Sequence, residues 1–341
     1  MPSDEIVQLV HGAGGERMED LIRRIILPTF KIQRVGEGVG LPELDDGASI
    51  PIITEQELVA TIDAHTVSPI FFPGGNIGHL AAAGTINDLA VMGARPLALL
   101  DAIVVEEGFS TDKLQAIVQS LNQVAESVGV AVIGGDFKVV EKGNIDQIVI
   151  TTAGIGIAPR GQVVTDAGAK PGDKIIVTGP IAEHGIAILA SRVGIELLGD
   201  LRSDVRPIWR AIDAALKVGG IHAMKDPTRG GLAAALNDIA EKSRVGMLLE
   251  EERIPLREPV RAAAELLGVD PLELTCEGVA LVIVDPEYAD DVLSAIRKTP
   301  EGSQAEIIGE VTEGRDVLLK TVIGGRRFID KPIGEPVPRV C

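Results

Sequence analysis

Aspartate residues recur beside glycine, or in loops of small residues, along this chain of 341 residues. The stretches are Asp45-Asp46-Gly47, Asp63, Asn87-Asp88, Gly134-Gly135-Asp136 and Asp226-Pro227-Thr228. Mg²⁺ takes hard oxygen ligands, usually one or two carboxylates per ion together with substrate phosphates. Glycine beside the carboxylates lets backbone N–H groups approach those phosphates. A single Asp-Gly pair is more often a surface turn, but the recurrence of such stretches predicts a metal–phosphate site.

The most informative stretch is Asp226-Pro227-Thr228-Arg229-Gly230-Gly231, which directly precedes a predicted helix over Leu232–Ala240. The N-terminus of a helix binds anions through its free N–H groups and its dipole. Thr228 and Arg229 add a hydroxyl and a cation at that point, which favours an anion site. The alternative is an ordinary helix cap formed by Asp226 or Thr228.

Two further residues have the type and placement for acid–base or charge-stabilising chemistry. Lys138 follows Asp136 by two positions and could steady a phosphate or a developing oxyanion; alternatively it is a solvated lysine of a loop. Glu277 precedes the apolar run Val279–Val284, and a carboxylate at the mouth of a strand can act as a general base. The alternative for Glu277 is an exposed loop acid. Its neighbour Cys276 is expected to be a small buried residue rather than a nucleophile.

The chain ends in a proline-rich stretch whose last residue, Cys341, is one of only 2 cysteines. The prolines Pro332, Pro336 and Pro338 exclude a helix, because each ring removes an N–H group and fixes φ. They favour an extended arm with a solvated backbone, which at ~3.1 Å per residue would reach about 30–40 Å. A thiol at the tip of such an arm suggests a carrier that brings a bound group to a site, whereas the alternative is a loose chain end.

Strands and helices must position these residues, and hydrophobic periodicity predicts where those elements lie. The clearest helix covers Thr111–Val128, with apolar residues at i, i+3, i+4 and i+7 and a glycine directly after it. A strand over Leu58–Ile62 is expected to end at Asp63, and a strand over Val130–Ile133 to run into the loop at Gly134. Further helices are expected over Ile181–Val193, Val205–Val218, Arg257–Leu267 and Tyr288–Ile296.

A segment rich in glycine and proline, Ala158–Pro171, is the expected domain boundary. We therefore expect an N-terminal ATP-binding and dimerisation domain over residues 1–160, a C-terminal α/β domain over 161–329, and a flexible tail over 330–341 that carries the terminal cysteine. Both halves mix strands and helices with short connections, so the fold class is α/β or α+β.

The composition limits the partners and the compartment. Apolar residues make up 45% of the chain but aromatic residues only 2%, so the core must consist of Ala, Val, Ile and Leu. The formal net charge of −18 argues against nucleic acid or an anionic membrane as the main partner. Two cysteines are too few for a disulfide framework, no bilayer-spanning apolar run or secretory signal is visible, and a reducing cytoplasm is the natural compartment.

Several of these stretches together resemble a known family, the HypE family of hydrogenase maturation factors, which belongs with aminoimidazole ribonucleotide synthetase and selenophosphate synthetase. They are His11–Gly15, Asp45–Ala48, Asn87–Ala90, Gly134–Glu141, Asp226–Gly231 and the ending Pro338-Arg339-Val340-Cys341. The resemblance spans essentially the whole chain, and the ending selects the HypE family. The chain departs at Phe137, where the family commonly has Thr, and at Val340, where Ile is common. Neither departure removes a chemical group on which the interpretation depends.

The resemblance implies a two-domain fold like that of aminoimidazole ribonucleotide synthetase, with an extended C-terminal tail, and a homodimer formed through the N-terminal halves. It also implies ATP and Mg²⁺ as cofactors. The implied metal ligands are Asp46, Asp63, Asp88 and Asp226. The implied nucleotide-binding residues are Asn87, Asp88, Gly134, Gly135, Asp136, Lys138, Thr228 and Arg229. The implied catalytic residues are Cys341, Lys138 and Glu277.

The reaction implied by the resemblance is the ATP-dependent dehydration of a carboxamide held on Cys341. The carbamoyltransferase HypF would load the sulfur, and a HypC–HypD complex would accept the cyanide for the iron centre of [NiFe]-hydrogenase. Arg339 would favour the thiolate form of Cys341. Two alternatives remain: another ATP-dependent enzyme of the same superfamily that acts on a free small substrate, and a non-catalytic maturation scaffold.

Overall fold

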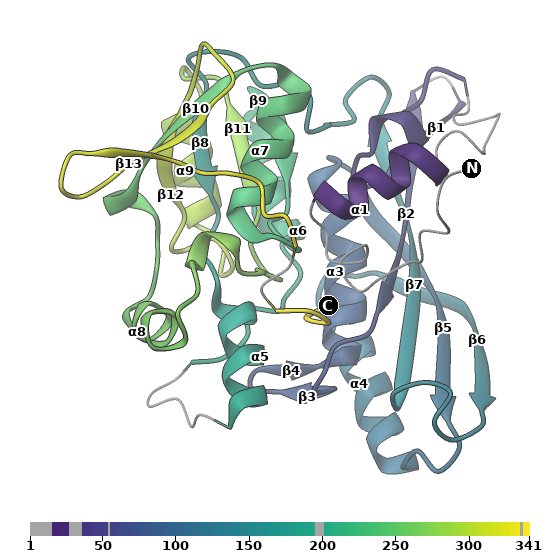
Figure 1. Cartoon of the computed structure of the whole chain (residues 1–341). Helices are drawn as coiled ribbons and strands as arrows, with labels where there is room; N and C mark the ends of the chain where they lie inside the picture. The colour runs from purple at the N-terminus through teal and green to yellow at the C-terminus, as the bar shows by residue number, and fades with distance from the viewer. Residues whose placement is uncertain (1–15, 27–35, 54, 195–200, 335–336) are drawn as a thin grey trace, which may run out of the picture.

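The computed structural model of the chain describes residues 16–26, 36–53, 55–194, 201–334 and 337–341. The chain forms two halves that each combine a sheet with helices, and its C-terminus lies between them (Figure 1). The His11–Gly15 stretch of the family resemblance lies outside the described residues. Within the described ranges, no helix has both the length and the apolar character needed to cross a bilayer.

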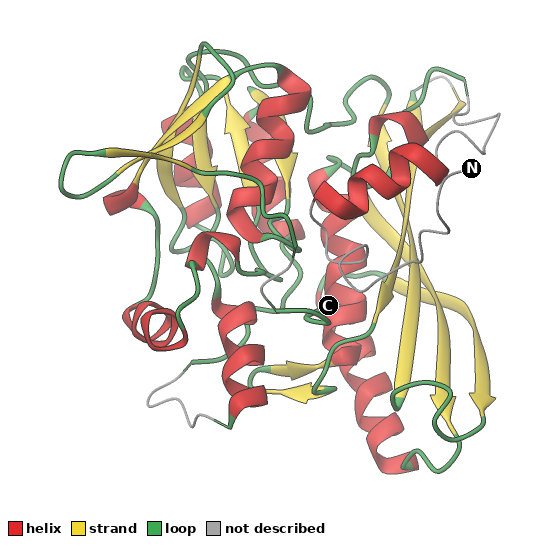
Figure 2. Ribbon diagram, in the orientation of Figure 1, coloured by secondary structure: helices red, strands yellow, loops and turns green. Residues whose placement is uncertain are grey.

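The first half is built on a five-stranded sheet in the order β1-β2-β7-β5-β6. Its strands are β1 (Ala48–Ile53), β2 (Gln56–His65), β7 (Ile148–Pro159), β5 (Arg95–Glu106) and β6 (Ala131–Val140). Only β5 and β6 are parallel, and the other neighbours are antiparallel. The helices α3 (Ile77–Val91) and α4 (Thr111–Ser127) pack against one face of this sheet (Figure 2).

The two helices of this half show how sequence pattern relates to environment. The predicted helix at residue 111 is confirmed as α4, and the Ser110 hydroxyl caps it by accepting a hydrogen bond from the Lys113 N–H at 3.4 Å. The Ala- and Gly-rich helix α3 is buried on nearly all sides and lacks an apolar stripe. A helix enclosed in this way carries no amphipathic signal, which is why periodicity alone did not reveal it.

The second half is built on a seven-stranded sheet in the order β14-β13-β10-β12-β8-β11-β9. Its strands are β8 (Lys174–Val177), β9 (Ile221–Lys225), β10 (Gly246–Glu250), β11 (Leu281–Val284), β12 (Glu306–Thr312), β13 (Val317–Lys320) and β14 (Arg326–Phe328). Its helices are α5 (Glu183–Val193), α6 (Trp209–Val218), α7 (Gly231–Ser243), α8 (Glu258–Leu267) and α9 (Ala289–Arg297). The chain also forms the short helix α1 (Glu16–Leu21), a π-helical turn (Ile22–Ile26) and the small hairpin β3 (Phe71–Phe72) and β4 (Gly75–Asn76).

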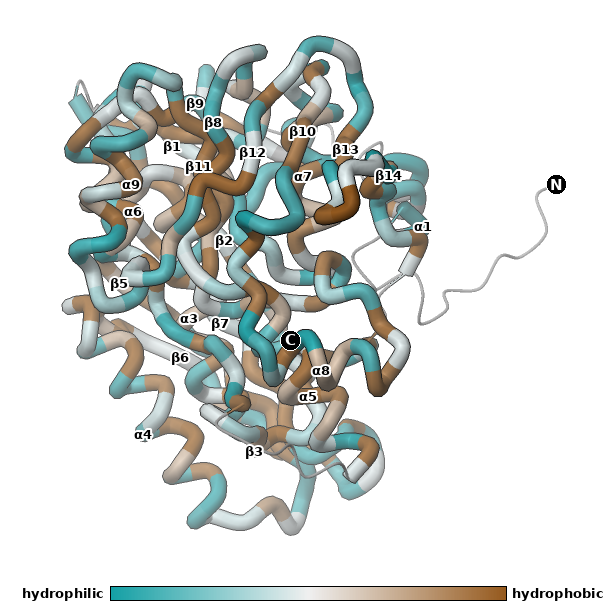
Figure 3. The backbone as a smooth tube through the Cα atoms, turned by 90° about the vertical axis from the view of Figure 1, so that its left-hand side faces the viewer, coloured by the Kyte–Doolittle hydropathy of each residue, from teal (hydrophilic) through white to brown (hydrophobic). Residues whose placement is uncertain are grey.

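The central strand β11 explains how the helices are layered. All four of its residues are buried, and they alternate between the two faces of the sheet. Val282 and Val284 pack with α6 and α9 on one face, while Leu281 and Ile283 belong to the core that includes α7 on the other. The apolar segments along β8 and β11 are the brown core strands of Figure 3.

The strand β6 corrects one prediction. The predicted strand was expected to end at Ile133 and leave Gly134, Gly135 and Asp136 in a loop, but β6 continues to Val140. The reason is local packing, because a Cβ atom at Gly135 would lie only 2.4 Å from Asp101 Oδ1 on the neighbouring strand β5. Gly135 therefore allows close strand pairing in a sheet rather than a loop.

The C-terminal tail corrects a second prediction. Residues 337–341 are not a solvated arm, because their carbonyl groups accept hydrogen bonds from both halves of the protein. Val337 and Val340 are buried. The Arg339 guanidinium binds Asp146 at 2.8 Å and donates to the Thr66 carbonyl at 3.0 Å. These contacts hold the Arg339 side chain against the first half of the protein.

Candidate functional site

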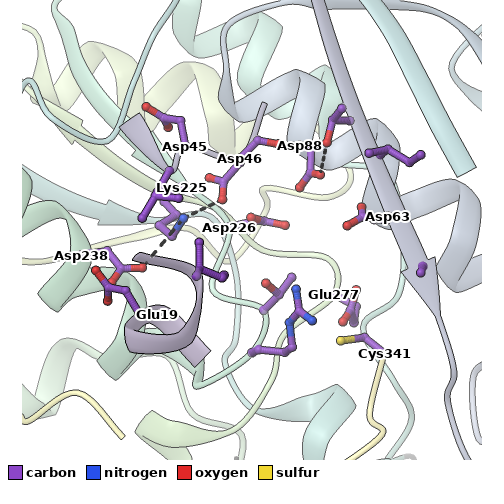
Figure 4. A pocket seen from close by; sticks show the side chains of 18 of the residues that line it. Glu19, Asp45, Asp46, Asp63, Asp88, Lys225, Asp226, Asp238, Glu277 and Cys341 are labelled. Carbon is purple, nitrogen blue, oxygen red and sulfur yellow. Dashed lines mark hydrogen bonds and ion pairs between the residues drawn. The ribbon is translucent and has the colours of Figure 1, made fainter. Parts of the chain in front are cut away.

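A pocket of about 490 Å³ lies where the two halves meet, and the end of the chain reaches into it (Figure 4). Its lining includes most of the polar residues that the sequence analysis singled out. These are Asp46, Asp63, Asp88, Asp226, Thr228, Arg229, Glu277 and Cys341. They come from the segment before β1, from β2, from α3, from the loop before α7, from the segment before β11 and from the C-terminal tail, so only the folded chain brings them together.

The carboxylates at the centre of this pocket repel one another; Asp226 is buried, and Asp63 and Asp88 are half-buried. Asp88 lies on α3 and accepts a hydrogen bond from the Thr61 hydroxyl at 2.8 Å. Burial, and then the negative charges of Asp63 and Asp226, raise the pKa of Asp88 well above its usual range. Burial, and then the charge of Asp46, raise the pKa of Asp226 to about 7. A cation placed among these groups would relieve both the repulsion and the cost of burial.

Two lysines, Lys225 and Lys242, partly neutralise the carboxylates at the Asp45 end of the pocket. The sequence analysis did not predict either of them as a site residue. The Lys225 ammonium at the end of β9 binds Asp46 Oδ1 at 2.6 Å. Lys242 on α7 binds the buried Asp166 at 2.8 Å and donates to the Leu44 carbonyl at 2.6 Å. The only sequence signal for Lys225 was its position directly before Asp226 at the end of an apolar strand.

The sequence analysis also did not predict a pair of salt bridges that Lys331 forms at this pocket. Lys331, near the start of the tail, binds Asp238 on α7 at 2.8 Å and Glu19 on α1 at 2.5 Å. All three residues line the pocket. The bridge joins segments that are far apart in the sequence, so no local pattern could have indicated it.

The chemistry of these residues fits a divalent cation. Asp45 Oδ1, Asp46 Oδ2 and Glu277 Oε1 are buried oxygen atoms without a hydrogen-bond partner. Burial, and then the charge of Asp166, raise the pKa of Asp45 to about 7. Within the described part of the chain, no group of three such side chains forms a ready-made metal cage. Mg²⁺ takes few protein ligands and completes its shell with phosphates and water, so unpartnered carboxylate oxygens of this kind could serve as its ligands.

Glu277 and Cys341 lie together at the end of the pocket away from Asp45 (Figure 4). Glu277 is only 3% exposed, and burial, followed by the charge of Asp204, raises its pKa well above the usual range. Asp204 also holds the Glu277 segment in place, because its carboxylate accepts the backbone N–H of Glu277 at 3.1 Å and that of Gly278 at 3.0 Å. The glutamate is therefore fixed in position and retains a proton readily.

The second cysteine is a structural residue, as expected. Cys276 is buried, and its sulfur accepts a hydrogen bond from the Ala182 N–H at 3.2 Å. Burial raises the pKa of the Cys276 thiol well above its usual range, so it stays protonated and unreactive. Of the two thiols, only that of Cys341 lines the pocket.

Asn87 does not line the pocket, although it was predicted to bind nucleotide. Its side chain is buried and joins the two halves. The amide nitrogen donates to the carbonyl groups of Arg206 and Glu277, both at 3.1 Å, and the amide oxygen accepts from the Ile208 N–H at 2.9 Å. The side chain is occupied as a link between the halves, since its partners lie on the second half.

The structure also does not bring Gly134, Gly135, Asp136 and Lys138 to the pocket. These residues lie on β6, at the opposite edge of the sheet from β1. Three strand spacings separate β6 from the pocket strand β2, which corresponds to about 14 Å. A lysine side chain cannot cover that distance, and the Lys138 ammonium instead binds Asp136 at 2.7 Å.

Comparison with protein families identifies the class to which this fold and site belong. Residues 44–158 match the N-terminal domain of AIR synthase related proteins, and residues 170–320 match their C-terminal domain. The fold and the site therefore define a protein of the AIR synthase related class. This match confirms the predicted two-domain fold with mixed helices and strands.

Individual relatives then narrow the class to a family. The chain is 49% identical to a putative hydrogenase expression/formation protein of Methanocaldococcus jannaschii, over 97% of this chain and 98% of that protein. It is 42% identical to the carbamoyl dehydratase HypE of Cupriavidus necator, over 98% of this chain and 95% of that protein. The chain belongs to the HypE family of carbamoyl dehydratases, which are hydrogenase maturation proteins, and the resemblance found in the sequence is confirmed.

Solved structures of the same family share the fold. A crystal structure of a HypE–HypF complex contains a chain that is 38% identical to this one, with a TM-score of 0.85 over 92% of this chain and 99% of that chain. A HypE crystal structure in complex with ATP is 36% identical, with a TM-score of 0.81 over 98% of this chain and all of that one (100%).

Proposed function

We propose that this protein dehydrates a carboxamide held as a thiocarboxamide on Cys341, at the expense of ATP, and so makes a protein-bound thiocyanate. The thiocyanate would supply cyanide for the iron centre of [NiFe]-hydrogenase. The observation that carries the proposal is the position of the Cys341 thiol, which lies in one pocket with the buried Glu277 and with a carboxylate cluster. This carboxylate cluster consists of Asp46, Asp63, Asp88 and Asp226. The carbamoyl dehydratase name of its relatives and the ATP complex of one of them support it.

The reaction needs a better leaving group than an amide oxygen. The bound group is S–C(=O)–NH₂, and its oxygen takes the terminal phosphoryl group of ATP while nitrogen loses one proton. Nitrogen then loses its second proton as phosphate departs, which leaves S–C≡N. The balance is one thiocarboxamide and one ATP converted into one thiocyanate, ADP, hydrogen phosphate and one released proton, so one of the two N–H protons ends on the phosphate. The site must therefore hold ATP near the amide oxygen and a base near the amide nitrogen.

Glu277 is the proposed base. Its carboxylate is buried beside the thiol, and a raised pKa makes it a stronger acceptor for an N–H proton once it is ionised. The hydrogen bonds from the backbone to Asp204 keep this segment in place during the reaction. A carboxylate fixed in this way needs no rearrangement before it accepts a proton.

The carboxylate cluster is the proposed site for Mg²⁺ and the phosphates of ATP. Asp46, Asp63, Asp88 and Asp226 would hold the cation, which when bound neutralises phosphate charge and orients the phosphoryl group. Thr228 and Arg229, which lie in the loop directly before α7, would contact the phosphates. The lysine of the pair Lys225–Asp46 is within the same pocket, so it can exchange its carboxylate partner for a phosphate oxygen.

A homodimer would give Lys138 a role in this site. The strand β6 ends the sheet, and its side chains Ile133, Phe137 and Val139 are 61%, 49% and 59% exposed. An apolar edge strand invites pairing with another chain. We propose that a second copy covers β6, and that Lys138, together with Gly134, Gly135 and Asp136, serves the pocket of the other subunit, where the lysine would stabilise the developing oxyanion.

The dimer proposal has a direct test. Val139→Glu places a charge in the proposed interface, far from the pocket of its own chain, and should convert a dimer into a monomer when the molar mass is measured by light scattering. Dehydration should fall with it, and Mg·ATP affinity should fall as well, because Gly134, Gly135 and Asp136 of the second copy would no longer reach the pocket. A wild-type protein that is monomeric at working concentration would remove Lys138 from the mechanism.

The proposed partners follow from the need to load and unload the sulfur. A carbamoyltransferase of the HypF kind would transfer the carbamoyl group to Cys341, as the complex of related HypE and HypF proteins suggests. A HypC–HypD complex would take the cyanide from the thiocyanate. Both exchanges require the tail to leave the pocket, and we propose that this movement takes place in the cytoplasm.

Mass spectrometry of Cys341 tests the whole proposal. The protein is incubated with the loading partner and carbamoyl donor, and ATP is added in a second step. The expected result is a carbamoyl adduct on Cys341 that loses one water mass only with ATP. Turnover of a free amide by a protein lacking Cys341 would indicate another enzyme of the superfamily. Loading without ATP turnover, and without any effect of changes at the aspartates, would indicate a scaffold.

A further inference from the structure

The last residues of the chain are held by a small set of side chains on α5. The guanidinium of Arg192 donates to the carbonyl groups of Pro338 and Arg339, each at 2.6 Å. The same guanidinium donates to the Ser68 carbonyl, also at 2.6 Å. Arg192 therefore joins the tail to the first half of the protein while itself belonging to the second.

His184, two turns earlier on the same helix, holds the next carbonyl of the tail. Its Nε2 is 2.8 Å from the Val340 carbonyl, and its Nδ1 is 2.7 Å from the Ser203 hydroxyl. Burial lowers the pKa of His184 to about 4, so the ring is neutral near pH 7 and has one N–H group. Because a carbonyl can only accept, that N–H lies on Nε2, and Nδ1 accepts the Ser203 hydroxyl proton.

The opposite side of the tail pairs with a short segment after β2 in the manner of an added strand. The Thr66 N–H donates to the Cys341 carbonyl at 3.2 Å, and the Ser68 N–H donates to the Arg339 carbonyl at 3.1 Å. Between these two bonds the Val340 side chain is fully buried. The tail is thus fixed through its backbone, with one apolar anchor next to the reactive cysteine.

These contacts act on the tail and not on the reacting group. Apart from the Val340 anchor, they engage main-chain carbonyls, so they set where the chain end lies without touching the sulfur substituent. A guanidinium presents several donors in one rigid plane, which suits the simultaneous binding of three carbonyl oxygens. A lysine at the same place would bind fewer of them at once.

We propose that His184 and Arg192 form a tail clamp that positions the loaded Cys341 in the pocket for dehydration. This inference rests on the proposed function of the pocket. Both residues are positioning residues, because they act on the reaction through the backbone of the tail. Loading takes place with the tail outside the pocket, so it does not need the clamp. The clamp instead sets the fraction of loaded protein whose thiocarboxamide lies beside Glu277.

The direct test measures how well Cys341 is protected in the unloaded protein, with neither partner nor ATP present. A bulky maleimide is added, and the alkylation rate of each cysteine is followed by peptide mass mapping. The variants are Arg192→Ala, Arg192→Lys and His184→Phe; the last keeps a ring against Phe72, which now packs edge-on with a centroid distance of 5.2 Å. Arg261→Ala on the exposed side of α8 is the matched control.

The expected result is a rise of about tenfold or more in the Cys341 alkylation rate for Arg192→Ala and His184→Phe, because charge-assisted and buried hydrogen bonds are lost. Arg192→Lys should be intermediate and Arg261→Ala unchanged. Alkylation is measured from pH 6 to 10, and rates are compared at the alkaline plateau, where the thiolate fraction no longer differs between variants. The buried Cys276 reports unfolding, so it should stay protected throughout.

Unchanged protection of Cys341 in all three variants, with Cys276 still protected, overturns the clamp. If Arg192→Ala also exposes Cys276, that variant is unfolded, and the test rests on Arg192→Lys and His184→Phe. Unchanged protection of Cys341 in these two variants then overturns the clamp. A second measurement follows the loaded protein: the clamp variants should accept carbamoyl at the wild-type rate but dehydrate it more slowly. A wild type that never dehydrates the adduct refutes the proposed function, while slower alkylation of Cys341 than in the variants would still show that His184 and Arg192 hold the tail in the pocket.

Discussion

The two ends of the pocket differ in how their charges are balanced. At one end Lys225 binds Asp46, and Lys242 binds Asp166. At the other end Glu277 is buried with one oxygen unpartnered, beside a thiol. The first end is therefore a network of exchangeable ion pairs, and the second holds a single carboxylate of raised pKa.

The difference matches the two parts of the proposed reaction. A polyphosphate and its cation bring high charge, which an ion-pair network can accept by exchanging partners. A thiocarboxamide is neutral, and what it needs is a base whose carboxylate is poorly solvated and fixed. The following variants test this difference between the two ends of the pocket. They are ordered from the largest expected effect on the reaction to the smallest.

Cys341→Ala removes the carrier thiol. We expect no adduct and no product, since no other described thiol lines the pocket. Mg·ATP affinity by calorimetry should stay within about twofold, or ~0.4 kcal/mol, because the phosphate end is untouched. Product formed by this variant would move the reaction to a free substrate.

Glu277→Gln removes the proposed base while keeping the shape of the side chain. Loading should proceed, and the intact mass should show the carbamoyl adduct. Dehydration with ATP should slow by about 10²- to 10⁴-fold, the usual contribution of a general base. Single-turnover mass spectrometry measures the two steps separately.

The pH dependence of the dehydration rate is a second test of Glu277 as the base. A base must be ionised, so the wild-type dehydration rate should rise with pH through the elevated pKa of Glu277. That rise should be absent in Glu277→Gln. A variant with the wild-type rate and pH profile would show that another carboxylate acts as the base.

Asp88→Asn and Asp226→Asn should change ligand affinity and ligand-free stability in opposite directions. Loss of an anionic ligand should weaken Mg·ATP binding by about tenfold, or ~1.4 kcal/mol. The pKa of Asp226 is about 7 in the folded protein, above its ordinary value, so its contribution to stability is present at low pH and is lost as pH rises through 7. Asp226→Asn should therefore raise the ligand-free melting temperature at pH 8 and flatten its pH dependence.

Asp291→Asn, on the exposed face of α9, is the control for both measurements and should change neither. Differential scanning calorimetry with and without Mg·ATP gives the two quantities on one sample. Equal affinity of Asp226→Asn and wild type for Mg·ATP would exclude this carboxylate from the cation site.

Cys276→Ala should have the smallest effect on the chemistry. It removes a buried sulfur that accepts the Ala182 N–H, so the free energy of unfolding should fall by about 1–3 kcal/mol. Loading and dehydration per folded molecule should be unchanged. A loss of dehydration without a loss of stability would give this thiol a chemical role.

Sequence patterns predicted the local features of this molecule well. Helix α4 follows from its apolar periodicity and its Ser110 cap, both of which are local. The Asp226 stretch was singled out because it precedes a predicted helix, and Glu277 because it precedes an apolar run, and the fold brings both to the pocket. Strand ends and helix starts meet at the same edges of sheets, so loops of this kind gather without any knowledge of the topology.

The predictions failed where the decisive partner is distant in the sequence. Asn87 binds the Glu277 carbonyl, which lies 190 positions away, and α5 captures the tail through Arg192, which lies 146 positions from Pro338. Gly135 is a glycine because of Asp101 on the neighbouring strand. Local sequence patterns predict helices, strands and loops, but they do not reveal contacts between residues that lie far apart in the chain.

The amide of Asn87 has a thermodynamic consequence for the proposed reaction. It fastens α3, and with it the adjacent Asp88, to the backbone of Glu277 by buried hydrogen bonds. The cation site and the base are thereby parts of one rigid framework, whose assembly is completed during folding. Ordering the tail in the pocket is then the main conformational cost of each turnover. A protein whose tail is tethered in the pocket should therefore dehydrate the adduct with a less negative activation entropy than the native chain.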